Sequence, residues 1–223
     1  MEQGASQGSA EARILTLSKL KGVGAALAAA LLAAAAARAG EPSGREVRCL
    51  GLVAFTEAAV DGPTGMAAVI RVVRKRTADP RFPDDACAAV AQVAQFQPVA
   101  RSAVLQKVVR DPEGHDIPQV VGARSPRARR LLLEALRLAR EPLRAPDPTG
   151  GALYFVNPDL MDAGRCPWFA ALRRTARIGG HVFLAEHRPG EAPGGPALDC
   201  AAAGAGRPAA RTGRPVVAAT DGP

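Results

Sequence analysis

The segment that most constrains the fold is REVRCLGLVAFTEAAV, residues 45–60, because it is apolar on nearly every side. Leu50 and Val53 fall at helical spacing on one face, and Leu52 and Phe55 occupy the opposite face. This pattern is typical of a helix that is buried in a core rather than lying on a surface. An Asp-Gly-Pro turn follows it. We therefore expect a helix over 45–60 around which the domain packs.

Glu57 is the one carboxylate in this segment between Glu46 and Asp61, and it shares a face with Leu50 and Val53. No Arg or Lys lies within one helical turn of it. Burial without a nearby positive charge raises the pKa of a carboxyl group. A carboxyl that stays protonated near neutral pH is what general-acid cleavage of a glycosidic bond requires. A structural buried glutamate, satisfied by backbone or by a distant arginine, fits the same pattern, so both interpretations stay open.

The N-terminal region has the pattern of an export signal. Lys19 and Lys21 precede an uncharged run from Gly22 to Ala37, and the small-x-small triplet Ala-Arg-Ala ends at Ala39. These features predict a secretory signal peptide over residues 1–39, with an uncleaved N-terminal anchor as the alternative. The apolar run is short for a membrane span, which needs about 20 residues. We expect an exported protein, periplasmic or cell-wall associated, with no stable membrane insertion once the signal is cleaved.

Export gives the cysteines a structural interpretation. The chain has four, Cys49, Cys87, Cys166 and Cys200, and all lie beyond the predicted signal. An oxidising compartment favours two disulfides, although the sequence allows three ways of pairing them. We favour Cys49–Cys87 and Cys166–Cys200. No Cys-x-x-Cys motif occurs and the three histidines are scattered, so we predict no metal site and no cofactor.

The charge balance does not by itself indicate a nucleic-acid partner. The 223 residues carry 29 Lys+Arg against 21 Asp+Glu, a net charge of +8. The basic residues are mostly arginines spread along the whole chain, which raises the isoelectric point without forming a patch. The run of Arg127, Arg129 and Arg130 lies on a predicted helix. It is interpreted as a solvated helix face rather than a phosphate site.

The remaining pattern predicts a mostly helical α+β domain over residues 40–187. After it, residues 188–223 are rich in Gly, Pro and Ala and are expected to be disordered. Trp168 and Phe169 are expected to point inward from the last predicted helix. The expected helices are 45–60, 65–77, 84–92, 97–110, 125–141 and 158–177, and the expected pair of short strands is 152–156 and 181–185.

Four ordered segments of the chain carry a family resemblance. The segment CLGLVAFTEAAVDGPTGMAAVIRVVRKRTADPRFPDDACAAV, residues 49–90, is followed by Gln95-Phe96, by ALYFVNP at 152–158 and by IGGHVF at 178–183. Together they resemble the SleB-type cell wall hydrolases. The resemblance implies a small lysozyme-like α+β fold that acts on peptidoglycan glycan strands without a metal, with Glu57 as general acid/base.

The resemblance also suggests further site residues. Asp61, one turn beyond Glu57, is the local candidate for a supporting carboxylate, and a helix-terminating role explains it equally well. The candidates for substrate binding are Gln95, Phe96, Tyr154, Asn157 and His181, although Phe96 also suits a core and His181 also suits a brace between strands.

The sequence departs from the family pattern at several polar positions, where for example Asp61 shortens a second acid and Gln97 replaces a Ser. Ala59 stands where the family has an Arg, and Lys75 where it has an Asn. Glu57, which matches the family's general acid, is kept.

Two functions from different classes follow. One is an exported enzyme that cleaves between N-acetylmuramic acid and N-acetylglucosamine, as a lytic transglycosylase or muramidase. The other is a catalytically weakened module that only binds peptidoglycan. A basic nucleic-acid-binding protein is a third reading, which the export signal argues against.

Overall fold

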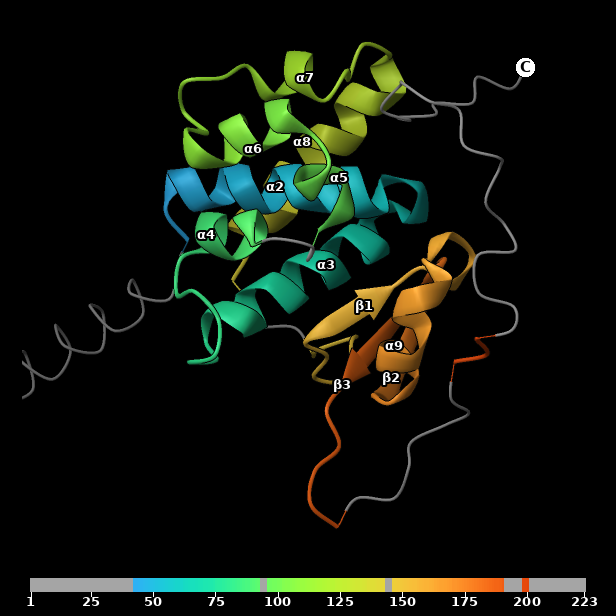
Figure 1. Ribbon diagram of the computed structural model, residues 1–223. Helices are drawn as coiled ribbons and strands as arrows, with labels where there is room; N and C mark the ends of the chain where they lie inside the picture. Colours follow the sequence, from blue (N-terminus) through green and yellow to red (C-terminus); the bar gives the residue numbers. More distant parts are fainter. Residues whose placement is uncertain (1–41, 93–95, 143–145, 191–197, 201–223) are drawn as a thin grey trace, which may run out of the picture. The chain divides into compact units, whose positions relative to one another are not determined.

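The computed structural model describes residues 42–92, 96–142, 146–190 and 198–200, which belong to one compact unit (Figure 1). The predicted signal peptide and most of the predicted tail lie outside the described residues. The fold is mostly helical with one small antiparallel sheet, which confirms the predicted α+β class. The helices before the sheet are α2 (Gly44–Ala58), α3 (Gly62–Thr77), α4 (Ala86–Ala91), α5 (Gln97–Ala100), α6 (Ala103–Arg110), α7 (Ile117–Val120) and α8 (Pro126–Arg140).

Helix α2 is the centre of the helical layer, as its all-round apolar pattern predicts. Ser43 caps its N-terminus, where the Ser43 side chain accepts from the backbone of Glu46 and the Glu46 carboxylate accepts from the backbone of Ser43. Leu50, Leu52 and Val53 are at most 1% exposed although they point in different directions. Helices α3, α4 and α8 surround α2 and bury these side chains (Figure 1).

The sheet consists of β1 (Tyr154–Val156), β2 (Arg173–Ile178) and β3 (His181–Ala185) in the order β1-β3-β2. The central strand β3 is buried along its whole length and pairs antiparallel with both neighbours. Its side chains alternate between two faces. Phe183 packs with Ala68 and Val72 of α3, and Val182 and Leu184 pack on the other side. The sheet therefore lies between α3 and the short helix α9 (Cys166–Ala170) (Figure 1).

The predicted helix over 158–177 is wrong. Two 3-10 turns, η2 (Pro158–Leu160) and η3 (Ala163–Arg165), precede α9, and β2 begins at Arg173. Strands β2 and β3 form a hairpin across Gly179-Gly180, and Gly179 has a positive φ of 57°. A Gly-Gly pair supplies the turn geometry of a tight hairpin, so pairing with β3 extends this backbone against its helical pattern.

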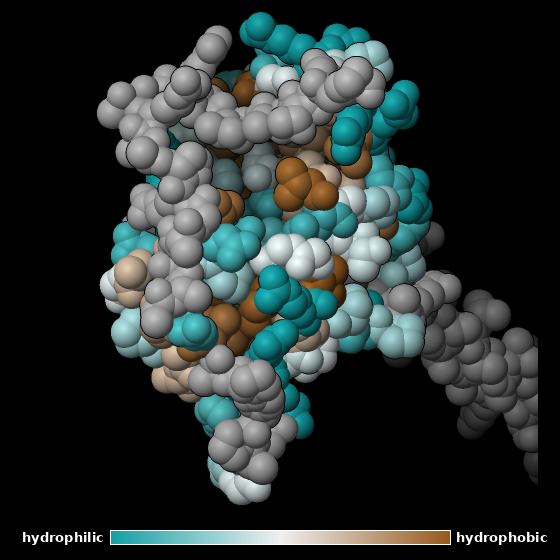
Figure 2. All heavy atoms as spheres, turned by 90° about the vertical axis from the view of Figure 1, so that its right-hand side faces the viewer, coloured by the Kyte–Doolittle hydropathy of each residue, from teal (hydrophilic) through white to brown (hydrophobic). Residues whose placement is uncertain are grey.

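Smaller differences concern the ends of elements. The predicted helix 97–110 is divided into α5 and α6, and α7 forms where a polar loop was expected. Arg127, Arg129 and Arg130 are all exposed on α8, in keeping with a solvated helix face. On the face shown in Figure 2, hydrophobic residues reach the surface in separate patches bordered by hydrophilic ones.

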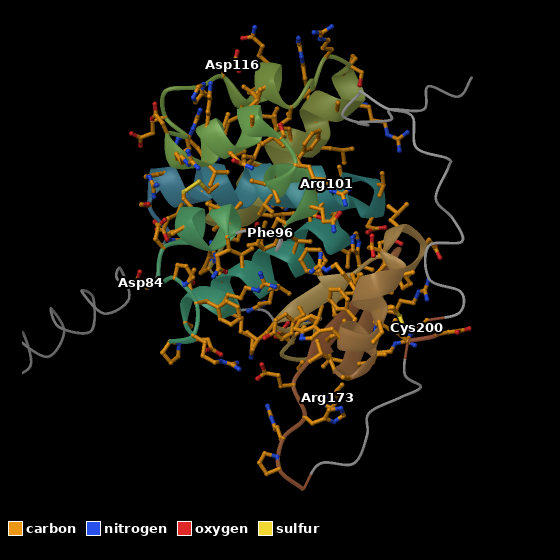
Figure 3. The ribbon with its side chains drawn as sticks, viewed as in Figure 1. Asp84, Phe96, Arg101, Asp116, Arg173 and Cys200 are labelled. Atoms are coloured by element: carbon orange, nitrogen blue, oxygen red, sulfur yellow. A yellow bond between two sulfur atoms is a disulfide. The ribbon has the colours of Figure 1, made fainter. Side chains whose placement is uncertain are left out.

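Both expected disulfides are present. Cys49 and Cys87 join α2 to α4, and Cys166 joins the start of α9 to Cys200 (Figure 3). The first pair lies inside the helical core and the second inside the cluster beneath the sheet. Each bridge therefore fixes one of the two layers.

Candidate active site

Glu57 lies in the last turn of α2, where the buried helix comes to the surface. Its side chain is partly exposed, but one carboxyl oxygen, Oε1, is inaccessible to solvent. That oxygen has no hydrogen-bond partner among the residues that the structure describes. A buried polar atom without a partner is costly to a folded protein and is concentrated at functional sites.

Burial raises the pKa of Glu57 to about 8, and the positive charge of Arg76 lowers it only in part. Desolvation dominates because the anionic form loses water without gaining a hydrogen bond to Oε1. Most Glu57 side chains therefore carry a proton at neutral pH. The group can donate that proton to a ligand oxygen, and Arg76 can stabilise the carboxylate left behind.

Arg76 is an unusual charge because its side chain is only 2% exposed. It extends from the side of α3 that faces the sheet, two helical turns beyond Ala68, and its Nε donates to the carbonyl of Leu153 at 2.7 Å. The guanidinium lies 5.1–5.5 Å from the ring centroids of three aromatic residues, namely Phe82, Phe96 and Tyr154. Burial lowers the pKa of Arg76 to about 10, which leaves it charged at neutral pH.

Asp61 connects the start of α3 to the hairpin. Its Oδ2 is 2.6 Å from Nδ1 of His181, and its Oδ1 accepts from the backbone N–H of Gly180 at 3.0 Å. A Cβ at Gly179 would lie 2.1 Å from Asp61 Oδ1, so the close approach requires glycine there. Both Asp61 oxygens are thus used in binding the β2–β3 turn.

A hollow of about 360 Å³ lies beside β1. Tyr154 and Trp168 form an edge-to-face pair on its wall, with ring centroids 5.1 Å apart. The Tyr154 hydroxyl donates to Glu186, which Arg81 also binds through Nη1. The lining residues are Arg76, Tyr154, Phe155, Gly164, Arg165, Trp168 and Phe169. Arg76 lines this hollow, and its positive charge also lowers the pKa of Glu57.

The other residues predicted to contact substrate are not among the described residues that line this hollow. Phe96 is 0% exposed in the interior (Figure 3), so its ring packs in the core and is not open to a ligand. The Asn157 side chain accepts from the backbone of Asp159 and caps η2. His181 is 5% exposed and its ring packs edge-on against Phe155. Gln95 lies outside the described residues.

Sequence reasoning missed two residues of this region. Trp168 was expected to point inward, but it is 51% exposed, because α9 is a single short turn that buries Phe169 instead. Arg76 lies within the basic run Arg74-Lys75-Arg76, and although it matches the Arg of an Asn-Arg pair in the family pattern, it was not named as a site residue. Spacing from Val72 on the sheet side of α3 is a second pattern that could have distinguished it.

Two classes of feature do not occur within the described ranges. Across 42–92, 96–142, 146–190 and 198–200, no three His, Cys, Asp or Glu side chains cluster in a way that could hold a metal ion. In the same part of the chain, no helix is both long and apolar enough to cross a membrane.

Comparison with known proteins places the chain in a family. The cell wall hydrolase family matches residues 61–184, and we conclude that the chain belongs to this family. The match begins four residues after Glu57, so it does not itself assign a role to that side chain.

Two curated relatives are spore cortex-lytic enzymes. The one from Halalkalibacterium halodurans is 28% identical over 141 residues, which is 63% of this chain and 35% of the relative. The one from Bacillus subtilis is 27% identical over 151 residues, 68% of this chain and 41% of the relative. The match thus spans less than half the length of each relative.

Two solved structures are similar at a greater distance. The catalytic domain of the germination-specific lytic transglycosylase SleB from Bacillus anthracis has 22% identity and a TM-score of 0.44, covering 64% of this chain and 96% of that domain. The catalytic domain of the Bacillus cereus SleB protein has 22% identity and a TM-score of 0.43, covering 65% and 92%. At this distance the structural likeness carries no conclusion about chemistry.

Proposed function

We propose that the chain is an exported enzyme that cleaves peptidoglycan glycan strands between N-acetylmuramic acid and N-acetylglucosamine, with Glu57 as general acid/base. Membership of the cell wall hydrolase family supports the substrate class. The single observation that carries the catalytic assignment is the buried, unpartnered Glu57 Oε1, in a carboxyl whose pKa is raised to about 8. A group in this state is a proton donor at neutral pH.

In the proposed reaction Glu57 donates its proton to the glycosidic oxygen while the bond from that oxygen to C1 of N-acetylmuramic acid breaks. In a lytic transglycosylase the 6-hydroxyl of the same sugar then attacks C1, and its proton returns to Glu57. In a muramidase, water attacks C1 and gives up the proton instead. Both routes regenerate the acid, and Arg76 stabilises the carboxylate formed between the two proton transfers.

Asp61 is proposed to act indirectly, by fixing the β2–β3 hairpin at the start of α3, close to Glu57 in the sequence. The carboxylate contacts His181 and the hairpin, so it holds the sheet against the start of α3, four residues beyond Glu57. Tyr154 lines the hollow beside Arg76 and is retained as a substrate-contact candidate. Residues 1–39 are proposed to direct export, which puts the domain in the compartment that contains peptidoglycan.

The test uses the full chain and purified sacculi. Wild-type protein should release soluble muropeptides, and Glu57→Gln should release none while keeping its near-UV circular dichroism. Glu113→Gln is the matched control, because Glu113 is an exposed carboxylate in the loop between α6 and α7. Equal release by wild type and Glu57→Gln would overturn the assignment.

Mass analysis of the products separates the two routes, because transglycosylation yields anhydro sugars and hydrolysis yields reducing ends. Ala59 and Lys75, which replace polar family residues, favour testing a second function. If the wild-type chain sediments with sacculi and releases no fragments, the chain is a peptidoglycan-binding module.

A further inference from the structure

The charge in the hollow beside β1 is one-sided. Two of its lining side chains, Arg76 and Arg165, are guanidinium groups, and none is a carboxylate. The other lining residues are Gly164 and four aromatic residues, Tyr154, Phe155, Trp168 and Phe169. A small hollow with aromatic walls and positive charge is suited to a ligand that combines an apolar body with an anionic group.

The Arg76 guanidinium has a fixed position in the lining of the hollow. The Nε bond to Leu153 and the three surrounding rings fix the guanidinium in one orientation. Its Nη1 is inaccessible to solvent and has no hydrogen-bond partner among the described residues. A buried guanidinium N–H without an acceptor is unfavourable, and a planar guanidinium pairs best with a carboxylate.

The acidic side chains around Arg76 do not supply that carboxylate. Glu186 accepts from the Tyr154 hydroxyl and from Arg81, whose Nε and Nη2 in turn bind Asp79. Glu57 acts on Arg76 only through space and makes no hydrogen bond to it, and burial raises the Glu57 pKa so that the group is mostly neutral at pH 7. The positive charge of Arg76 is therefore available to a ligand.

We propose that this hollow binds a carboxylate carried on the lactyl ether of N-acetylmuramic acid. The proposal rests on the proposed function for its substrate. The carboxylate comes either from the lactyl group itself, where the sugar has no peptide, or from the stem peptide attached to it. Arg76 and Arg165 attract the carboxylate, and the rings of Tyr154 and Trp168 pack against the apolar side of the ligand.

Trp168 gives a direct measurement, because it is the single tryptophan of the chain and it lines the hollow. Its fluorescence is titrated in the full-length protein with three ligands. These are N-acetylmuramic acid, which has a free lactyl carboxylate, N-acetylmuramoyl dipeptide, in which the carboxylates belong to the peptide, and N-acetylglucosamine, which has no lactyl group. At least one acidic ligand should bind roughly tenfold or more tightly than N-acetylglucosamine, and added salt should weaken it.

The acidic ligand that binds identifies the source of the carboxylate. Arg165→Gln should reduce its affinity several-fold, and Arg76→Gln should abolish the preference for acidic ligands. Arg130→Gln is the matched control, because it removes the same charge from the exposed face of α8. If Arg76→Gln does not fold, Arg165→Gln and the salt dependence decide the question.

Equal affinity for all three ligands would overturn the proposal, and so would an acidic preference that both hollow variants retain. Glu57→Gln should bind the acidic ligand as wild type does, which separates binding from cleavage. If wild-type protein digests sacculi but shows no acidic preference, the binding inference fails and the enzymatic function stands. If it binds the acidic ligand but releases no fragments, the enzymatic function fails.

Discussion

Replacing Glu57 with glutamine should make the protein more stable at neutral pH while it abolishes cleavage. Glutamine keeps the shape of the protonated side chain but cannot ionise. Wild-type Glu57 has a pKa of about 8 in the folded chain and an ordinary value of 4.5 when unfolded. Between these values the folded chain keeps a proton that the unfolded chain releases. The free energy of unfolding of wild type therefore falls as pH rises from 4.5 to 8, and the variant avoids that loss.

The size of the effect follows from these two pKa values. The quantity compared is the free energy of unfolding of Glu57→Gln minus that of wild type, counted from its value well below pH 4.5. This difference should grow by about 1 kcal/mol at pH 5, about 3 kcal/mol at pH 7 and about 5 kcal/mol at pH 9. The gain should level off above the folded pKa, because both states of the wild type are then ionised. A functional side chain that costs stability is expected where a site needs a buried ionisable group.

The measurement is urea unfolding of both chains at several pH values, without reductant so that the two disulfides remain. Glu113→Gln is again the control, and its difference from wild type should stay nearly constant over the same pH range, because Glu113 is exposed. A stability difference between Glu57→Gln and wild type that does not change with pH would refute the argument. So would a wild type that becomes the more stable protein as pH rises.

Three further predictions concern the site and its support. Cleavage of sacculi by wild type should decline as pH rises through about 8, because Glu57 must be protonated to act as the acid, and a rate that keeps rising to pH 10 would contradict this. Asp61→Ala should lower the free energy of unfolding by roughly 3 kcal/mol in urea, since it leaves buried His181 Nδ1 and a backbone N–H without their acceptor. Replacing both Cys49 and Cys87 with alanine should cost about 4 kcal/mol for a separation of 38 residues, and an unchanged urea midpoint would refute it.

Local patterns were sufficient for much of the fold. The all-round apolar segment predicts a buried α2, and Ser125 before Pro126 predicts the start of α8. These elements form as predicted because burial periodicity and capping act within a few residues of the chain. Strand β2 could not be predicted in the same way, since Arg173–Ile178 becomes extended only by pairing with β3. Pairing energy depends on a partner strand that a local pattern does not contain.

The candidate site likewise has features that local sequence determines and features that depend on tertiary contacts. By itself, the sequence determined that Glu57 is a carboxylate on a buried helix with no positive charge within one turn, and this already implies a raised pKa. Only the tertiary structure decided that Arg76 acts on it, that Trp168 is exposed, and that Asp61 meets His181 across 120 residues. Desolvation is set by the helix's own apolar pattern. Coulombic and hydrogen-bonded partners depend on distances in space, which packing alone establishes.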